Sequence, residues 1–398
     1  MTNQMYDAII VGARCAGSST AMLLARRGYR VLVVDRATFP SDTISTHLIH
    51  PPGVAALDRW GLLPAVIASD CPAIDTYSFD FGDLIIEGSP AGAGSRVAYA
   101  PRRTVLDKIL IDAAKEAGAE VREGFSVEDL VIEGDTATGI IGHSAGRSRV
   151  TEYARVVVGA DGVHSLVAKA VGAVQYAEKP KLQHSYYSYW TGLPMDGRFE
   201  TYVRPDRAFA AWPTNDSRTL VICGLPMRDF HDSRSDIEAG YLATMALVPS
   251  FAARARTATR VERLVGTAVP NFFRTPYGPG WALVGDAGYL KDFITAQGIQ
   301  DAFRDAELCV QALDQAFTGS RTYDAAMKEY QDTRDTQVMP MYEFTAQLAS
   351  LEPPDPEMQR LLGAVSQSPA AMDGFARVAA GVTSPAEFFS SPTLAAPS

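Results

Sequence analysis

Short apolar runs and helix-like stretches alternate at the start of the chain. Residues 8–13 (AIIVGA) and 30–36 (RVLVVDR) have the continuous apolar character of strands that are buried on both faces. Residues 16–28 between them carry the small and apolar side chains of a helix that packs on a sheet. The pattern predicts a strand–helix–strand unit of parallel type.

Patterns of buried strands and helices like those of the first unit return twice later in the chain. A region with a different, alternating pattern lies between them. Helical patterns at 53–69 and 103–118, and a buried strand at 154–160, extend the first unit. Residues 174–267 are instead rich in Tyr, Trp and Thr in alternating patterns, which predicts a separate antiparallel layer. A buried strand at 281–284 and a strong helix at 296–317 resume the first style, and the tail from residue 322 is helical.

This order predicts an α/β fold whose nucleotide-binding part is interrupted by a substrate layer. We assign residues 1–73, 101–173 and 271–335 to a Rossmann-type nucleotide-binding domain. The antiparallel substrate domain takes residues 74–100 and 174–270, and residues 336–398 form a C-terminal helical region.

Composition narrows the class of protein. A formal net charge of −10 without a basic cluster argues against nucleic acid as a partner, because such binding depends on neutralised phosphates. The four cysteines stand far apart without metal-ligand spacing, which predicts free thiols, no metal site and a reducing compartment. No run approaches the length of a membrane span, so we expect a soluble, cytoplasmic protein that acts on a small molecule.

The first turn carries most of a dinucleotide fingerprint. Gly12 and Gly17 fill the first and third glycine positions, and Arg14 replaces the middle one. Asp35 ends the next strand, where an acid binds a ribose hydroxyl. Arg36 fits either a 2′-phosphate site or an ordinary surface arginine. We therefore predict nucleotide contacts from the turn, Cys15 and Ala16 included, with Arg14 as an added cation.

Two more acidic motifs follow buried strands. Asp161 and Gly162 lie in GADG, and Gly285 and Asp286 lie in GDAG. With these three motifs, residues 5–335 resemble the flavoprotein monooxygenase superfamily of para-hydroxybenzoate hydroxylase-like fold, whose relatives include geranylgeranyl reductases and halogenases.

The resemblance implies a Rossmann-type FAD-binding domain, with FAD as cofactor and NAD(P)H as co-substrate. In that family the glycine turn binds the FAD pyrophosphate. The GADG motif supports FAD and the nicotinamide cofactor, and the GDA motif holds the ribitol. Arg103, ahead of a Leu-Asp helix, matches an arginine that reaches the cofactor. Taken singly, each acid is equally typical of a helix N-cap.

The next helix bears on the flavin itself. Its start, at Gly298 and Ile299, is expected against the pyrimidine end, where the helix dipole stabilises an anionic ring. The family's histidine near Tyr289 and proline near Phe293 are both replaced here.

The substrate side is less specific. Tyr187, Tyr189 and Trp212 lie in the predicted antiparallel layer, and we list them with Phe293 as substrate-binding candidates, although inter-layer packing explains them equally well. His47 follows the second strand and is the candidate catalytic residue, a proton carrier or else a loop residue bonded to backbone.

The leading interpretation is an FAD-dependent monooxygenase. It would use NAD(P)H and O₂, through a flavin C4a-hydroperoxide, to hydroxylate an aromatic or lipophilic small molecule. A reductase of carbon–carbon double bonds is the main alternative. A halogenase is less favoured because no WxWxIP stretch is present, and a non-catalytic flavoprotein is the alternative from a different class.

Overall fold

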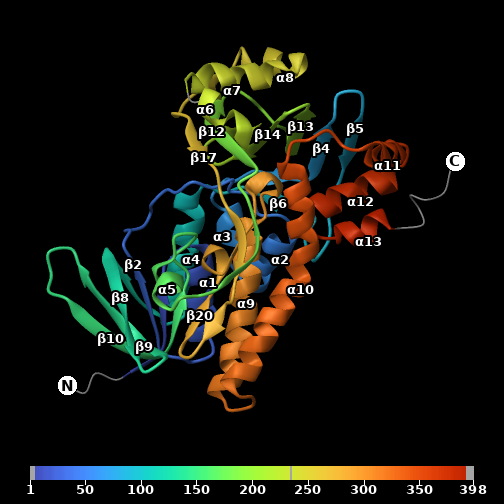
Figure 1. The fold of residues 1–398 in the computed structure, drawn as a ribbon. Coiled ribbons are helices and arrows are strands. Elements are labelled where there is room, and N and C mark those ends of the chain that lie inside the picture. The colour runs from blue at the N-terminus through green and yellow to red at the C-terminus, as the bar shows by residue number, and fades with distance from the viewer. Residues whose placement is uncertain (1–4, 234, 391–398) are drawn as a thin grey trace.

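The computed structural model describes residues 5–233 and 235–390. It has two large sheets joined by helices, with the first sheet low and the second high in the view of Figure 1. The fold is the predicted one: a Rossmann-type α/β unit, an interleaved antiparallel sheet and C-terminal helices. Residues 1–4 and 391–398, which belong to the first and last predicted segments, lie outside the described residues.

The first sheet is assembled from three separated parts of the chain. Its central strands β20, β10, β1, β2 and β7 are parallel neighbours in that order, and β19 and the β8–β9 hairpin join it in antiparallel fashion. The strands are β1 (Tyr6–Val11), β2 (Val31–Asp35), β7 (Glu120–Glu123), β8 (Phe125–Glu133), β9 (Thr136–Ser144), β10 (Val150–Gly159), β19 (Tyr277–Gly278) and β20 (Trp281–Leu283).

Helices cover this sheet because its strands are apolar on both faces. The helix α1 lies between α4 and α9, and α10 packs along α9. The bounds are α1 (Cys15–Ala25), α2 (Pro51–Arg59), α3 (Leu63–Ile67), α4 (Arg103–Glu116), α5 (Leu166–Ala170), α9 (Gly298–Phe317) and α10 (Tyr323–Ala349).

The second sheet is antiparallel apart from one pair. Its order is β16-β12-β15-β14-β13-β4-β5, β17 also pairs with β12, and β13 pairs with β4 in parallel. The strands are β4 (Thr76–Asp80), β5 (Ile85–Gly88), β12 (Gln183–Thr191), β13 (Arg198–Arg204), β14 (Arg207–Thr214), β15 (Arg218–Pro226), β16 (Thr259–Arg260) and β17 (Val265–Thr267).

Helices cover both faces of this sheet. On one side lie η1 (Met227–Asp229), α6 (Phe230–Ser233), α7 (Ile237–Ala246) and α8 (Pro249–Ala255). On the other, α11 (Pro356–Ser366), α12 (Pro369–Ala379) and α13 (Pro385–Phe389) close an aromatic core with β4, β13 and β14.

Small sheets connect the two halves. They are β3 (Ala73–Ile74) with β6 (Ala98–Tyr99), and β11 (Gln175–Lys179) with β18 (Asn271–Arg274) and β21 (Tyr289–Leu290). The short 3₁₀ helices η2 (Gly285–Ala287) and η3 (Phe293–Thr295) lie on either side of β21.

Two boundaries predicted from the sequence differ from the structure. The single helix expected over 53–69 is two helices, α2 and α3, because Gly61 takes a φ of 76° between them. The boundary placed between residues 335 and 336 falls inside the continuous helix α10. A repeating apolar pattern marks buried faces but does not mark where a chain turns.

The close packing of Gly17 against Gly12 in the first turn can be tested by substitution. A Cβ added to Gly17 would lie 1.8 Å from the carbonyl oxygen of Gly12, which is backbone and has no room to move. Gly17→Ala should therefore lower the free energy of unfolding by about 3 kcal/mol or more. Gly363→Ala in α11 is the matched control, because nothing lies within 4 Å of its added Cβ. Thermal unfolding measures both variants, and equal melting temperatures would contradict this packing.

Candidate active site

The glycine turn is built by contacts between backbones. Gly12 has a φ of 104°, and a Cβ there would lie 2.4 Å from the carbonyl oxygen of Ala160. The carboxylate of Asp35 accepts hydrogen bonds from the backbone N–H of Ala13 (2.7 Å) and of Ala37 (2.8 Å). Asp35 thus ties the turn to the end of β2, the position predicted for it, and Arg36 beside it is exposed.

Arg14 reaches across to α4 and to the loop after β2. Its guanidinium lies 2.6 Å from the fully buried carboxylate of Asp107 and donates to the hydroxyl of Ser41 at 2.8 Å. Asp107 also binds Arg103 through two hydrogen bonds of 3.0 and 3.1 Å. The cation that replaces the middle glycine is therefore paired, and it connects three segments at the start of α1.

Cys15 belongs to the same cluster. Its thiol lies 3.5 Å from the carboxylate of Asp107, and burial raises its pKa to about 12. The thiol therefore stays protonated at neutral pH and packs as a small apolar group beside Ala16. The side chain of Ala16 fits under Gly285, where a Cβ would lie 2.9 Å away. The GDA turn thus rests directly on the start of α1.

Asp161 caps a helix. Its carboxylate accepts from the hydroxyl of Ser165 at 2.5 Å and from the backbone N–H of Leu166 at 2.7 Å, at the start of α5. This is the structural role that the sequence left open beside cofactor binding. Gly162 follows with a φ of 78° and open space where a Cβ would be.

Asp286 presents a different picture. Its side chain is exposed, while the neighbours on both sides, Gly285 and Ala287, are buried. Desolvation by the surrounding protein raises its pKa to about 6, and the positive charge of Arg103 acts against that rise. An exposed carboxylate beside a buried arginine fits the hydroxyl groups of a cofactor.

A buried ion network lies beneath the GDA turn. The ammonium of Lys291 binds Asp301 and the hydroxyl of Tyr289, and Arg304 binds Asp301 at 2.7 Å and Asp305 at 2.8 Å. Burial opposes ionisation of Asp301, but the two cations lower its pKa. Asp305 also accepts from the backbone N–H of Gly285 at 3.2 Å, which fixes the turn on α9.

The N-terminus of α9 meets open space. Gly298 is exposed, and nothing lies within 4 Å of an added Cβ. Ile299, the next residue, is buried, and Phe293 in η3 is half-buried. The positive end of this 20-residue helix is therefore accessible to an anionic or electron-rich ring.

The aromatic candidates are buried in the second sheet. The exposed fractions are 5% for Tyr187, 3% for Tyr189 and 1% for Trp212, and all three belong to the core shared with the C-terminal helices. The indole N–H of Trp212 donates to the carbonyl of Thr46 at 3.1 Å. They thus pack between layers and also contact the loop that carries His47.

His47 is fully buried in a left-handed backbone conformation, with a φ of 61°. Its Nε2 shares a hydrogen bond with the hydroxyl of Tyr189, while Nδ1 has no partner among the described residues. Burial lowers its pKa to about 3, so the imidazole is neutral at pH 7. A proton carrier that cycles at neutral pH needs a higher pKa than this.

Several residues of the site were not predicted from the sequence. Arg102 stacks its guanidinium 4.0 Å from the ring centre of Tyr189 and binds Asp42 and Glu262, each at 2.9 Å. Its position next to Arg103, at the start of a predicted helix, could have indicated that Arg102 belongs to the site. Asp301, Arg304 and Asp305 also have the spacing of one helix face. Asp107, four residues after Arg103 on α4, has that spacing too, whereas Gln183 and Asp292 gave no such signal.

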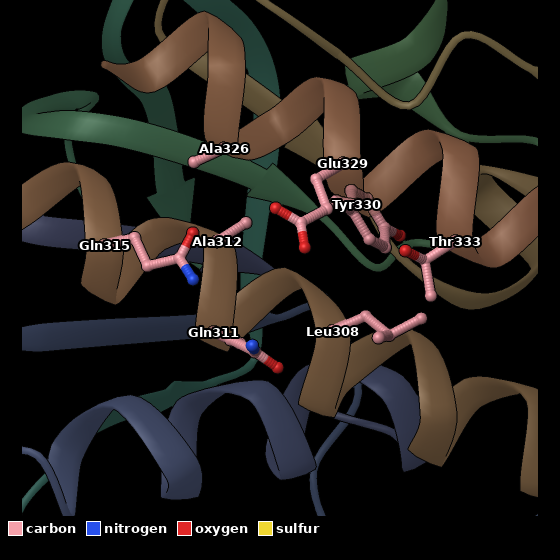
Figure 2. A pocket seen from close by; sticks show the side chains of 8 residues that line it. All are labelled: Leu308, Gln311, Ala312, Gln315, Ala326, Glu329, Tyr330 and Thr333. Carbon is pink, nitrogen blue, oxygen red and sulfur yellow. The ribbon is translucent and has the colours of Figure 1, made fainter. Parts of the chain in front are cut away.

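Two hollows in the described residues lie away from this site. A cavity of about 110 Å³ lies between α9 and α10. Figure 2 shows the side chains that line it, among them Gln311, Gln315 and Glu329. A second, of about 380 Å³, lies beside Arg122 and Phe125 near the β8–β9 hairpin. Neither is lined by a residue predicted for the site. Among the described residues, no group of three or more His, Cys, Asp or Glu could hold a metal ion, and no helix is long and apolar enough to cross a membrane.

These features are those of a flavoprotein oxidoreductase. Residues 5–345 match the FAD-binding-domain family, and the chain belongs to that family. It is therefore an FAD-binding oxidoreductase, as the resemblance implied.

Three similar proteins illustrate its range. The digeranylgeranylglycerophospholipid reductase of Methanocella arvoryzae is 27% identical over 81% of this chain and 83% of its own. The phenazine 1,6-dicarboxylic acid hydroxylase of Lysobacter antibioticus is 27% identical over 92% of this chain and 97% of its own. The structure of the myxobacterial chondrochloren halogenase superposes with a TM-score of 0.80, at 21% identity, over 97% of this chain and 99% of its own.

Removal of the Asp286 carboxylate tests the site. Asp286→Ala should lose FAD, because it removes the exposed carboxylate that is expected to accept hydrogen bonds from the cofactor's hydroxyl groups. Gel filtration followed by flavin absorbance measures the retained cofactor. Asp135→Asn on the exposed β8–β9 turn is the control and should keep full occupancy. Full occupancy in the alanine variant would show that the ribitol is held elsewhere.

The buried His47 should make folding sensitive to acid. Its pKa is about 6.5 when unfolded and about 3 when folded, so the unfolded state takes up the proton first as the pH falls. His47 alone should then cost about 2 kcal/mol of stability at pH 5 relative to neutral pH. In His47→Gln this part of the acid sensitivity should be absent, so the variant should lose less stability between pH 7 and pH 5 than wild type. Denaturant unfolding at the two pH values measures the difference. An unchanged acid sensitivity in the variant would contradict the low pKa.

Proposed function

We propose that this protein is an FAD-dependent monooxygenase that uses NAD(P)H and O₂ to hydroxylate an aromatic or otherwise lipophilic small molecule. The observation that carries the proposal is the buried aromatic layer on one side of the second sheet, next to the loop of His47. Tyr187, Tyr189 and Trp212 share one core with Leu48, next to His47, and with Ala296, just before α9. An apolar substrate on this face would lie between the sheet and the expected flavin.

The residues of the site fit FAD. No side chain of the described residues caps the start of α1, Asp286 is exposed for hydroxyl groups, and the open N-terminus of α9 suits the pyrimidine end of the ring. When bound, FAD would supply hydride acceptance from NAD(P)H and activation of O₂. The chain would then orient the ring, exclude water through the aromatic core and provide the positive end of α9.

We also place this reaction in the cytoplasm. Cys15, Cys71, Cys223 and Cys309 are all free and buried, as is usual in a reducing compartment. NAD(P)H is available there as the reductant.

A reductase of carbon–carbon double bonds is the second candidate. The favouring observation is the 27% identity to an archaeal prenyl-lipid reductase over 81% of this chain. The same apolar aromatic layer would also suit a prenyl chain. The two candidates differ in their need for O₂.

One experiment separates them. The FAD-loaded protein is supplied with NADPH or NADH and with either planar aromatic acids and phenols or prenylated lipids, with and without ¹⁸O₂. A monooxygenase gives product that contains one ¹⁸O atom, and it gives no product without O₂. Product that gains two hydrogens under anaerobic conditions would overturn the proposal and support the reductase. NAD(P)H oxidation that no compound stimulates would point to a flavoprotein without this activity.

A further inference from the structure

Three buried polar side chains form a joint between the second sheet and the small sheet that contains β18 and β21. Gln183 at the start of β12, Asn271 at the start of β18 and Asp292 just before η3 have exposed fractions of 1%, 2% and 1%. The amide of Gln183 donates to Oδ1 of Asp292 at 2.6 Å. The backbone N–H of Asp292 in turn donates to the side-chain oxygen of Asn271 at 2.7 Å. No prediction from the sequence involved any of these three residues.

The two oxygens of Asp292 have different surroundings. Oδ1 accepts from Gln183 and also from the backbone N–H of Ile294 at 2.9 Å. Oδ2 is buried and has no hydrogen-bond partner among the described residues. An ionised carboxylate with one buried, unpaired oxygen is costly, whereas a neutral acid with its proton on that oxygen is much less so. Desolvation accordingly raises the pKa of Asp292 to about 7.

No neighbouring cation offsets this burial. Lys291, the adjacent residue, directs its ammonium to Asp301 and Tyr289. His50 binds the carbonyl of Thr295, and burial lowers its pKa to about 4, so it is neutral at pH 7.

The groups on the sheet side are likewise directed elsewhere. His184, next to Gln183, interacts electrostatically with Asp229 and Arg207, and its pKa is lowered by burial. The pKa of Asp292 is set by burial, which raises it, and by the hydrogen bonds from Gln183 and Ile294, which lower it. Neither of these two partners is charged.

The joint connects the expected substrate face with the expected flavin. Gln183, Tyr187 and Tyr189 occupy alternate positions of β12, so their side chains lie on the same face of the sheet. Asp292 opens the segment that runs through η3 to the N-terminus of α9. The hydrogen bond between Gln183 and Asp292 therefore holds that segment against the strand that carries the tyrosines.

We propose that Asp292 is a positioning residue whose neutral, protonated form holds the flavin-facing segment on the substrate sheet, and whose deprotonation loosens this joint. The proposal rests on the FAD site of the proposed function, but it is the same for a monooxygenase and a reductase. It assigns a proton-linked control of cofactor binding to a residue that need not touch the flavin.

The test compares FAD affinity from pH 5.5 to 8.5 in wild type and Asp292→Asn, by quenching of flavin fluorescence. Wild type should bind FAD more weakly above pH 7, by up to about tenfold per pH unit. Asp292→Asn is neutral at every pH and should keep the low-pH affinity throughout. Asp135→Asn, an exposed control, should follow wild type.

A second variant keeps the carboxyl group but removes the hydrogen bond from Gln183, so it should weaken FAD binding and also move the titration of Asp292. Because the hydrogen bond from Gln183 lowers the pKa of Asp292, Gln183→Met should shift the pH midpoint of FAD binding upward. A purely structural role would weaken binding without moving the midpoint.

Either of two results would overturn the proposal: a wild-type affinity that is flat through pH 7, or an unmoved midpoint in both Asp292→Asn and Gln183→Met. Absence of FAD binding at any pH would instead overturn the proposed function, and this inference with it.

Discussion

The fully buried carboxylate of Asp107 is the contact on which the nucleotide side of the molecule depends. It lies between Arg14 at the start of α1 and Arg103 at the start of α4, and Arg14 also holds the loop at Ser41. A buried carboxylate is stable only when it is paired, and loss of one partner of such a cluster typically costs about 3–5 kcal/mol. Asp107 therefore fixes the relative positions of two helices and a loop, and through Arg103 it influences the charge of Asp286.

The adjacent residues Arg102 and Arg103 contact different halves of the molecule. Arg103 turns toward the nucleotide side, while Arg102 stacks on Tyr189 and binds Asp42 and Glu262. The loop after β2 is thus held from both sides, by Arg14 at Ser41 and by Arg102 at Asp42. Any change in the second sheet that moves Tyr189 will act on the loop after β2, which also contacts the glycine turn through Arg14.

The sequence predicted the architecture well for physical reasons. Strands buried on both faces, glycines that close backbone contact requires at residues 12 and 17, and acids at strand ends leave local patterns. The contacts that complete the site are not local. Asp107 meets Arg14 across 93 positions, and Asp292 meets Gln183 across 109, so neither pairing has a periodic or spaced signature. His47 was selected by its position, but its burial and its low pKa come from a sheet more than a hundred residues away.

The interleaving of the first sheet also sets the order in which this chain can be assembled during synthesis. Strand β1 pairs with β10, and β10 pairs with β20 at residues 281–283, so the nucleotide-binding sheet stays open at an edge until most of the polypeptide has left the ribosome. Helix α9, which covers α1, emerges later still. Such long-range pairing slows folding and leaves apolar strands unpaired in the nascent chain. The antiparallel strands β12 to β15 are consecutive in the chain, so their pairing needs no segment from later in the sequence.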